Sequence, residues 1–149
     1  MKVIDGDSHF MEPLDLFERF IDPAYRDQAM RVEKDPATDA PSLVVEGRPL
    51  RILNVEELLA AVVGYGQKEA GHDLSDFDRY LTYSPDWQDM DKRVRFLDQE
   101  GIDCQVIYPT LGLLWEGGVD DPYVADALCR AYNTWAFELT ASHKDRLFP

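Results

Sequence analysis

Asp5, Asp7 and His9 are the residues of this sequence whose types and spacing most directly suggest chemistry. They follow one another at intervals of two near the start of the chain, and side chains at that interval point to one face of a β-strand. Carboxylates and an imidazole on one face can converge on a divalent cation. The spacing therefore predicts metal binding, while a polar strand end without a metal would show the same short string.

Glu12 follows His9 by three residues, and three roles are open to it. It could bind the same metal, or orient His9 from behind as a hydrogen-bond partner. It could also cap the short helix expected from Asp15. A calcium loop of the EF-hand type is not expected, because its glycine and its final glutamate are missing from the required positions.

Other candidate residues have less support. His72 lies in an irregular stretch, and His143 lies at the end of a long predicted helix, where contact with the terminal carbonyls is expected instead of metal binding. Arg93 and Arg95 fall on a predicted helix and are expected to be solvated charges. No serine or cysteine occupies a nucleophile motif, and no glycine-rich phosphate loop follows a strand.

The elements that must position these residues alternate between strand and helix patterns. Gly101 is expected to end the first long helix, since glycine favours the position just after a helix. Strands separated by helices imply parallel pairing with right-handed crossovers, which defines an α/β fold. In chain order we expect a strand over Lys2–Asp7, a short helix over Asp15–Ile21, a helix capped at Ser84-Pro85 and running to Glu100 with Phe96 on its buried side, a strand over Ile102–Tyr108, a helix from Pro122 past Leu139, and the start of a strand after Asp145.

The stretch from Met30 to Tyr83 interrupts this alternation. Its strand-like segments at Arg31–Glu33, Ser42–Val45 and Leu50–Leu53, with a turn at Glu46–Pro49, predict an inserted β-hairpin region. No linker-like composition separates two domains. We therefore expect residues 1–149 to form one domain with an insertion at about 30–83.

The amino-acid composition narrows the classes of molecule that the chain could bind and the compartments that it suits. The chain has 15 lysines and arginines against 29 aspartates and glutamates, a net charge of −14, which argues against nucleic acid and anionic membrane. No apolar run approaches the roughly 20 residues of a transmembrane helix, and the first residues do not resemble a signal peptide. Cys104 and Cys129 belong to no zinc-type spacing and are expected to be buried, reduced thiols of a cytoplasmic protein.

Three segments resemble a known family in the right order. They are Ile4-Asp5-Gly6-Asp7-Ser8-His9 with Glu12-Pro13, then Asp89–Arg93 with Glu100–Thr110, and Leu128–Asn133 with Asp145-Arg146-Leu147. Together they are similar to the amidohydrolase-related family that includes aminocarboxymuconate-semialdehyde decarboxylase and the resorcylate-type decarboxylases. The resemblance implies the N-terminal part of a TIM (β/α)8 barrel.

The resemblance also implies a metal site and a substrate. The family opens with an HxH or ExH metal-binding pair: His9 matches its second ligand, and Asp7 stands, as a departure, in place of the first. Zinc or manganese fits such mixed ligands. The implied reaction is hydrolysis or non-oxidative decarboxylation of a small carboxylated molecule. Tyr108 and Thr110, at the end of the second strand, either face that substrate or form a packed strand exit.

The length of the chain limits this expectation, because a full barrel needs about 250 residues. The family's later metal ligands and its proton-transfer residue have no counterpart here, so the barrel is expected to be incomplete, with weak metal binding and no turnover by the isolated chain. The alternative is a non-catalytic module that associates through the open barrel edge. Its partner would be a second copy, as in a homo-oligomer, or a missing C-terminal half.

Overall fold

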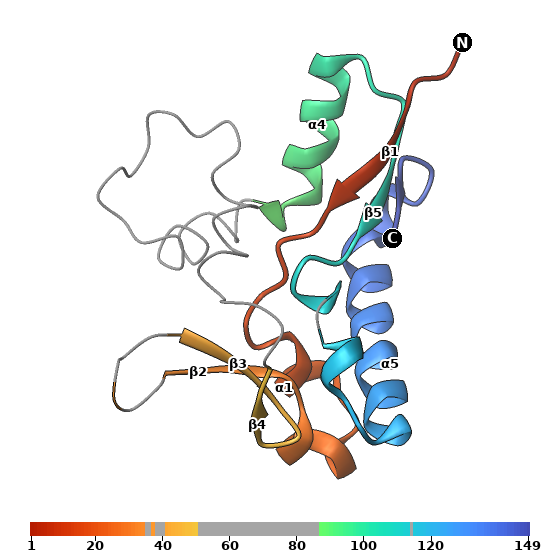
Figure 1. Cartoon of the computed structure of the whole chain (residues 1–149). Helices are drawn as coiled ribbons and strands as arrows, with labels where there is room; N and C mark the ends of the chain where they lie inside the picture. Colours follow the sequence, from red (N-terminus) through yellow and green to blue (C-terminus); the bar gives the residue numbers. More distant parts are fainter. Residues whose placement is uncertain (35–36, 38–40, 51–86, 114) are drawn as a thin grey trace.

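The computed structural model describes residues 1–34, 37, 41–50, 87–113 and 115–149, which form two three-stranded sheets with helices beside them (Figure 1). The elements in chain order are β1 (Ile4–His9), α1 (Leu16–Phe20), the 3₁₀ helix Pro23–Gln28, β2 (Arg31–Lys34), β3 (Pro41–Val45), β4 (Arg48–Pro49), α4 (Met90–Glu100), β5 (Cys104–Tyr108), the 3₁₀ turns Leu111–Leu113 and Glu116–Gly118, α5 (Pro122–Thr140), the 3₁₀ turn Ala141–His143, and β6 (Leu147–Phe148).

The first sheet is parallel, with strand order β1-β5-β6. Ile4 pairs with Cys104 and His9 with Tyr108, so β1 and β5 end side by side. Strand β6 joins the other edge of β5 through Gln105 and Leu147. The predicted α/β fold with parallel strands is thus confirmed, and the first strand extends two residues beyond its expected end at Asp7.

Helix α4 connects β1 to β5 and begins at Met90. Its N-cap is Asp89, whose Oδ1 accepts a hydrogen bond of 2.9 Å from the Lys92 amide. The expected cap at Ser84-Pro85 lies outside the described residues. Leu97 is fully buried, whereas Phe96 is 50% exposed, so its predicted burial is wrong. Phe96 directly precedes Leu97 and lies about 100° around the helix from it, and of the two Leu97 faces the core.

Gly101 ends α4 in the left-handed region, with φ of 70°, as expected for a C-terminal glycine. A β-carbon at this position would meet no atom within 4 Å. The cost of Gly101→Ala is therefore conformational alone, and we expect the free energy of unfolding to fall by about 1 kcal/mol. Urea denaturation checks this value. Gly101→Asn serves as control, because asparagine tolerates this conformation better, and an equal loss from both variants would contradict the explanation.

The second sheet is the predicted β-hairpin region, antiparallel in the order β2-β3-β4. Glu46 and Gly47 form its second turn with φ of 51° and 70°, the signs that a type I′ hairpin turn requires. Strand β4 starts directly after this two-residue turn, earlier than the return strand expected at Leu50–Leu53, of which residues 51–53 lie outside the described residues.

Glu46 connects this hairpin to the start of α5. Its carboxylate accepts hydrogen bonds from the amides of Asp121 at 2.8 Å and Asp120 at 3.2 Å. These bonds, led by that of Asp121, lower the pKa of Glu46. The hairpin turn is therefore bound to the N-terminus of a helix, where a negative charge is favoured.

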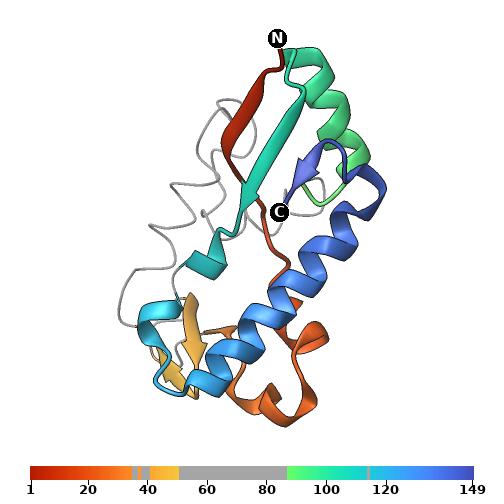
Figure 2. The ribbon, with the colours of Figure 1, turned by 90° about the vertical axis from the view of Figure 1, so that its right-hand side faces the viewer.

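Helix α5 supplies much of the core, as its periodicity predicts. Asp121 caps it by accepting a bond of 2.8 Å from the Tyr123 amide, and Val124, Leu128 and Trp135 are buried. Figures 1 and 2 show α5 running from the region of β6 to that of α1 and the hairpin. Buried residues of both sheets, including Val45, belong to the same hydrophobic cluster.

Two further expectations concern burial and membranes. Cys104 is partly exposed, whereas Cys129 is exposed, so the predicted burial of Cys129 is wrong. Cys129 lies on the outer side of α5, next to the buried Leu128. Within the described part of the chain, no helix combines the length and apolarity needed to cross a membrane.

Candidate functional site

A β-bulge in β1 separates Asp5 from Asp7 and His9. Asp5 pairs with Gln105 and Ser8 with Ile107, so three steps along β1 match two steps along β5. Such an extra residue shifts the alternation of side chains. Asp5 Oδ2 accepts a bond of 2.8 Å from Gln105 Nε2, and Asp5 Oδ1 accepts one of 3.2 Å from the Asp7 amide. The prediction that all three residues share one face assumes a regular strand, which the bulge interrupts, and the Asp5 carboxylate is bonded to Gln105 and to the Asp7 amide.

His9 is held in one tautomer by the end of β5. Its Nδ1 lies 2.8 Å from the carbonyl oxygen of Pro109. Because a carbonyl oxygen only accepts, Nδ1 must carry the proton, and in a neutral ring Nε2 then keeps a free lone pair. A histidine whose one nitrogen is anchored by a hydrogen bond in this way can present its other nitrogen to a cation.

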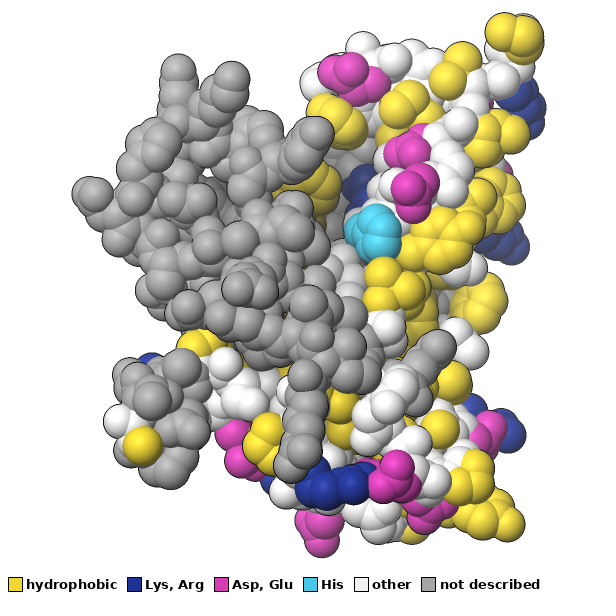
Figure 3. All heavy atoms as spheres, viewed as in Figure 1, with side chains coloured by type: hydrophobic (Ala, Val, Ile, Leu, Met, Phe, Trp, Pro, Cys, Tyr) yellow, Lys and Arg dark blue, Asp and Glu magenta, His cyan; other side chains and the backbone are white. Residues whose placement is uncertain are grey.

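Asp7 lies on the side of the free His9 nitrogen. Its Oδ1 is 3.8 Å from His9 Nε2, and the Asp7 side chain is 89% exposed against 38% for His9. Both line a hollow of about 210 Å³, whose other lining residues are Asp5, Ser8, Met11 and Trp87. Figure 3 shows a histidine side chain at the surface beside acidic and hydrophobic side chains. The pair offers one carboxylate and one imidazole, a donor set that fits part of a zinc or manganese site.

Tyr108 and Thr110 separate into two environments. Tyr108 is 43% exposed, and its ring centroid is 6.1 Å from that of His9. Thr110 is buried, and its hydroxyl donates a bond of 2.6 Å to the Phe10 carbonyl. Of the two residues proposed to face substrate, Tyr108 therefore borders the candidate site, whereas Thr110 forms part of the packed strand exit.

Glu12 is buried and fixes the loop that follows β5. Its carboxylate accepts bonds from the amides of Thr110 at 2.8 Å, Leu111 at 3.2 Å and Gly112 at 3.2 Å. Burial raises the pKa of Glu12, and these amide bonds counteract part of that rise. None of the three roles open to Glu12 in the sequence included this one, in which it joins the ends of β1 and β5.

Arg93 is a buried member of the site region that the sequence did not indicate. It is 7% exposed, and its Nη2 donates to the His9 carbonyl at 2.8 Å and to Ser8 Oγ at 2.6 Å. Its Nε donates to Gln105 Oε1 at 2.9 Å. The expectation of a solvated charge is wrong for Arg93, while Arg95 is exposed as predicted. A charged helix residue is buried only where such acceptors meet it.

The remaining polar clusters lie elsewhere. His143 Nε2 is 2.6 Å from Asp91 Oδ1, a hydrogen bond in place of the expected contact with helix carbonyls, and His72 lies outside the described residues. Within the described ranges, no three histidine, cysteine, aspartate or glutamate residues form a metal-binding group.

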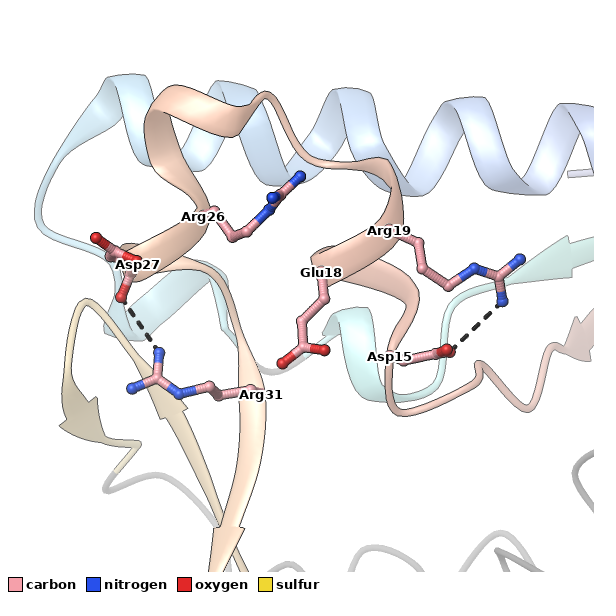
Figure 4. Close-up of a pocket in the computed structure, with 6 residues that line it drawn as sticks. All are labelled: Asp15, Glu18, Arg19, Arg26, Asp27 and Arg31. Carbon is pink, nitrogen blue, oxygen red and sulfur yellow. Dashed lines mark hydrogen bonds and ion pairs between the residues drawn. The ribbon is translucent and has the colours of Figure 1, made fainter.

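Figure 4 shows an open hollow that shares none of its described lining with the hollow beside His9. Its described lining consists of Asp15, Glu18, Arg19, Arg26, Asp27 and Arg31.

Comparison with known proteins bears on the fold. No protein-family model matches the chain, and no curated protein matches it. Among solved structures, the chain is similar to an amidohydrolase from Mycobacterium avium subsp. paratuberculosis K-10, with a TM-score of 0.68 and 23% identity. The similarity covers 99% of this chain and 40% of that one. The chain thus has the fold of part of an amidohydrolase and spans less than half of that protein's length.

Proposed function

We propose that this chain supplies the β1 portion of a divalent-metal centre in an enzyme of the amidohydrolase type. The observation that supports it best is the His9 ring, whose Nδ1 is anchored on the Pro109 carbonyl while Nε2 lies near the Asp7 carboxylate. The similarity of the chain's fold to that of an amidohydrolase supports the same proposal. Asp7 and His9 would hold zinc or manganese, the two ions that mixed carboxylate and imidazole ligands admit.

A bound divalent ion would polarise a substrate oxygen or acidify a water molecule. The residues of this chain would prepare that site. His9 presents Nε2, Asp7 adds a negative charge beside it, and the exposed Tyr108 ring lies next to the His9 ring. Trp87, which also lines the hollow, adds an apolar surface that would restrict water. Hydrolysis and non-oxidative decarboxylation of a small carboxylated substrate both suit this arrangement.

The other parts of the site would come from further strands of a TIM barrel. The similarity to the amidohydrolase covers 40% of that chain, and a catalytic metal usually has three protein ligands. Asp7 and His9 provide two. We therefore expect weak metal binding by residues 1–149 alone, with turnover dependent on a proton-transfer residue outside them.

A second candidate is a non-catalytic module that associates through its sheet. Ile4, Tyr108 and Phe148 are exposed hydrophobic residues of the three parallel strands. Within the described residues β1 and β6 are the edges of this sheet, and unpaired strand edges favour association. A chain that self-associates without binding metal would support this candidate over the enzyme.

The metal prediction can be tested by calorimetric titration of the chain with zinc and with manganese. We expect one site, and we expect His9→Ala and Asp7→Asn each to weaken it by at least about tenfold, because each removes a ligand. The pair His143 and Asp91 provides a matched control, since it also joins an imidazole to a carboxylate. His143→Ala and Asp91→Asn should leave the affinity unchanged. Binding that is lost with the control pair and kept without His9 would refute the proposal.

A further inference from the structure

Arg93 links α4 to the ends of two strands beside the candidate site. One of its nitrogens, Nη2, donates to the His9 carbonyl oxygen at 2.8 Å and to Ser8 Oγ at 2.6 Å. Its Nε donates to Gln105 Oε1 at 2.9 Å. The guanidinium thus joins β1 to β5 immediately behind the residue whose imidazole faces the hollow.

The same network continues into the bulge. Gln105 Nε2 donates to Asp5 Oδ2 at 2.8 Å, and Asp5 Oδ1 accepts from the Asp7 amide at 3.2 Å. A continuous series of hydrogen bonds therefore runs from Arg93 through Gln105 and Asp5 to the Asp7 backbone. Both residues of the candidate metal pair are attached to it through main-chain atoms.

We propose that Arg93 is a positioning residue for the metal pair: its guanidinium fixes the bulged end of β1 so that His9 Nδ1 meets the Pro109 carbonyl and Nε2 stays free beside Asp7. This inference deepens the proposed function and rests on it for the metal, but not for the conformation of the His9 ring. The same network holds the Asp5 carboxylate, which accepts a hydrogen bond from Gln105 Nε2.

The chemistry of arginine suits this role better than that of lysine. A guanidinium presents several donors in a rigid planar fork, whereas an ammonium is a single mobile donor group. Arg93 uses two of its nitrogens on three acceptors from β1 and β5, and its Cζ lies 5.6 Å from the centre of the Phe10 ring. Burial lowers the pKa of Arg93 to about 10, so the group is still charged at neutral pH.

The experiment has two readouts on the full chain. The first is a proton–nitrogen correlation spectrum of the imidazole rings without metal, above the ordinary histidine pKa, which identifies the tautomer of His9. The second is the affinity for zinc. In Arg93→Lys and Arg93→Gln we expect His9 to become a mixture of tautomers and zinc to bind about 10–100-fold more weakly, the range for lost supporting contacts at metal ligands. Arg95→Gln, on the exposed side of the same helix, should match the wild type in both.

The two readouts separate the two hypotheses. If the wild type binds no zinc but the Arg93 variants still change the His9 tautomer, the metal proposal fails and the positioning role stands. If the variants keep both the tautomer and the affinity, the positioning role is overturned. The His143 ring, bonded to Asp91, reports whether each variant is folded. If Arg93→Gln does not fold, Arg93→Lys and Gln105→Met are measured in its place by the same two readouts. An unchanged His9 signal in these folded variants would overturn the positioning role of Arg93.

Discussion

Replacing Glu12 by alanine is expected to lower the free energy of unfolding by about 3–5 kcal/mol. The Glu12 carboxylate is buried and accepts hydrogen bonds from the amides of Thr110, Leu111 and Gly112. Alanine would leave these amides buried without their acceptor, at about 1–3 kcal/mol for each unsatisfied group. Removal of a buried charge offsets part of the loss. Urea denaturation measures the effect, with Glu138→Ala on the exposed side of α5 as a control expected to stay within about 0.5 kcal/mol.

Glu12→Gln tests whether the charge or the hydrogen bonds matter, through the effect of pH. Burial raises the pKa of Glu12 in the folded chain, so the folded state binds this proton more tightly than the unfolded state. The wild type therefore loses stability as pH rises from the ordinary glutamate value through the raised one. Glutamine does not titrate, so the stability advantage of the wild type over Glu12→Gln should shrink over that range. If the stability advantage of the wild type instead grows with pH, the amide hydrogen bonds affect the pKa of Glu12 more strongly than burial does.

The parallel unit of β1, α4 and β5 could be predicted because its signals are local. Gly101 follows the last turn of α4, and the apolar alternation of β5 begins soon after it. Asp121 and Pro122 mark the start of α5 in the same way. Caps, breakers and hydrophobic periodicity act over a few residues, so the sequence contains them in full.

The bulge in β1 could not be predicted, and the faces of the residues around it depend on that bulge. The two-residue spacing of Asp5, Asp7 and His9 implies a single face only in a regular strand. The bulge is visible only in the register, where Asp5 pairs with Gln105 and Ser8 with Ile107. Gly6, in the middle of this string, is a weak hint, since glycine within a strand often marks a bulge.

The roles of Arg93 and Glu12 depend on partners far along the chain. Arg93 contacts the His9 carbonyl 84 residues away, and Glu12 contacts amides 98 to 100 residues away. A charged residue within an amphipathic helix usually faces solvent, so the residue type alone predicts an exposed position for Arg93, which is wrong. Backbone groups that act as partners leave no residue-type signal in the sequence.

Phe10→Ala is expected to lower the free energy of unfolding by about 3–5 kcal/mol, the range for truncation of a fully buried phenylalanine. Phe10 directly follows His9, and its side chain has no exposed surface. Its ring lies edge-on to that of Trp135, with centroids 5.1 Å apart, and 6.5 Å from that of Tyr132. Alanine would leave a cavity between β1 and α5 and would remove these aromatic contacts, which contribute beyond burial alone.

Two comparisons make this prediction specific to the site. Phe10→Leu keeps most of the apolar volume and should cost only about 1–2 kcal/mol, while Phe137→Ala, at a position 64% exposed on α5, should stay within about 0.5 kcal/mol of the wild type. The Phe10 backbone remains bonded in every variant, through its amide to the Tyr108 carbonyl and its carbonyl to the Thr110 hydroxyl. The His9 ring should therefore keep its tautomer in Phe10→Leu even though the chain is less stable. A changed His9 signal in that variant would mean that packing under β1, and not the Arg93 network alone, sets the direction of the imidazole.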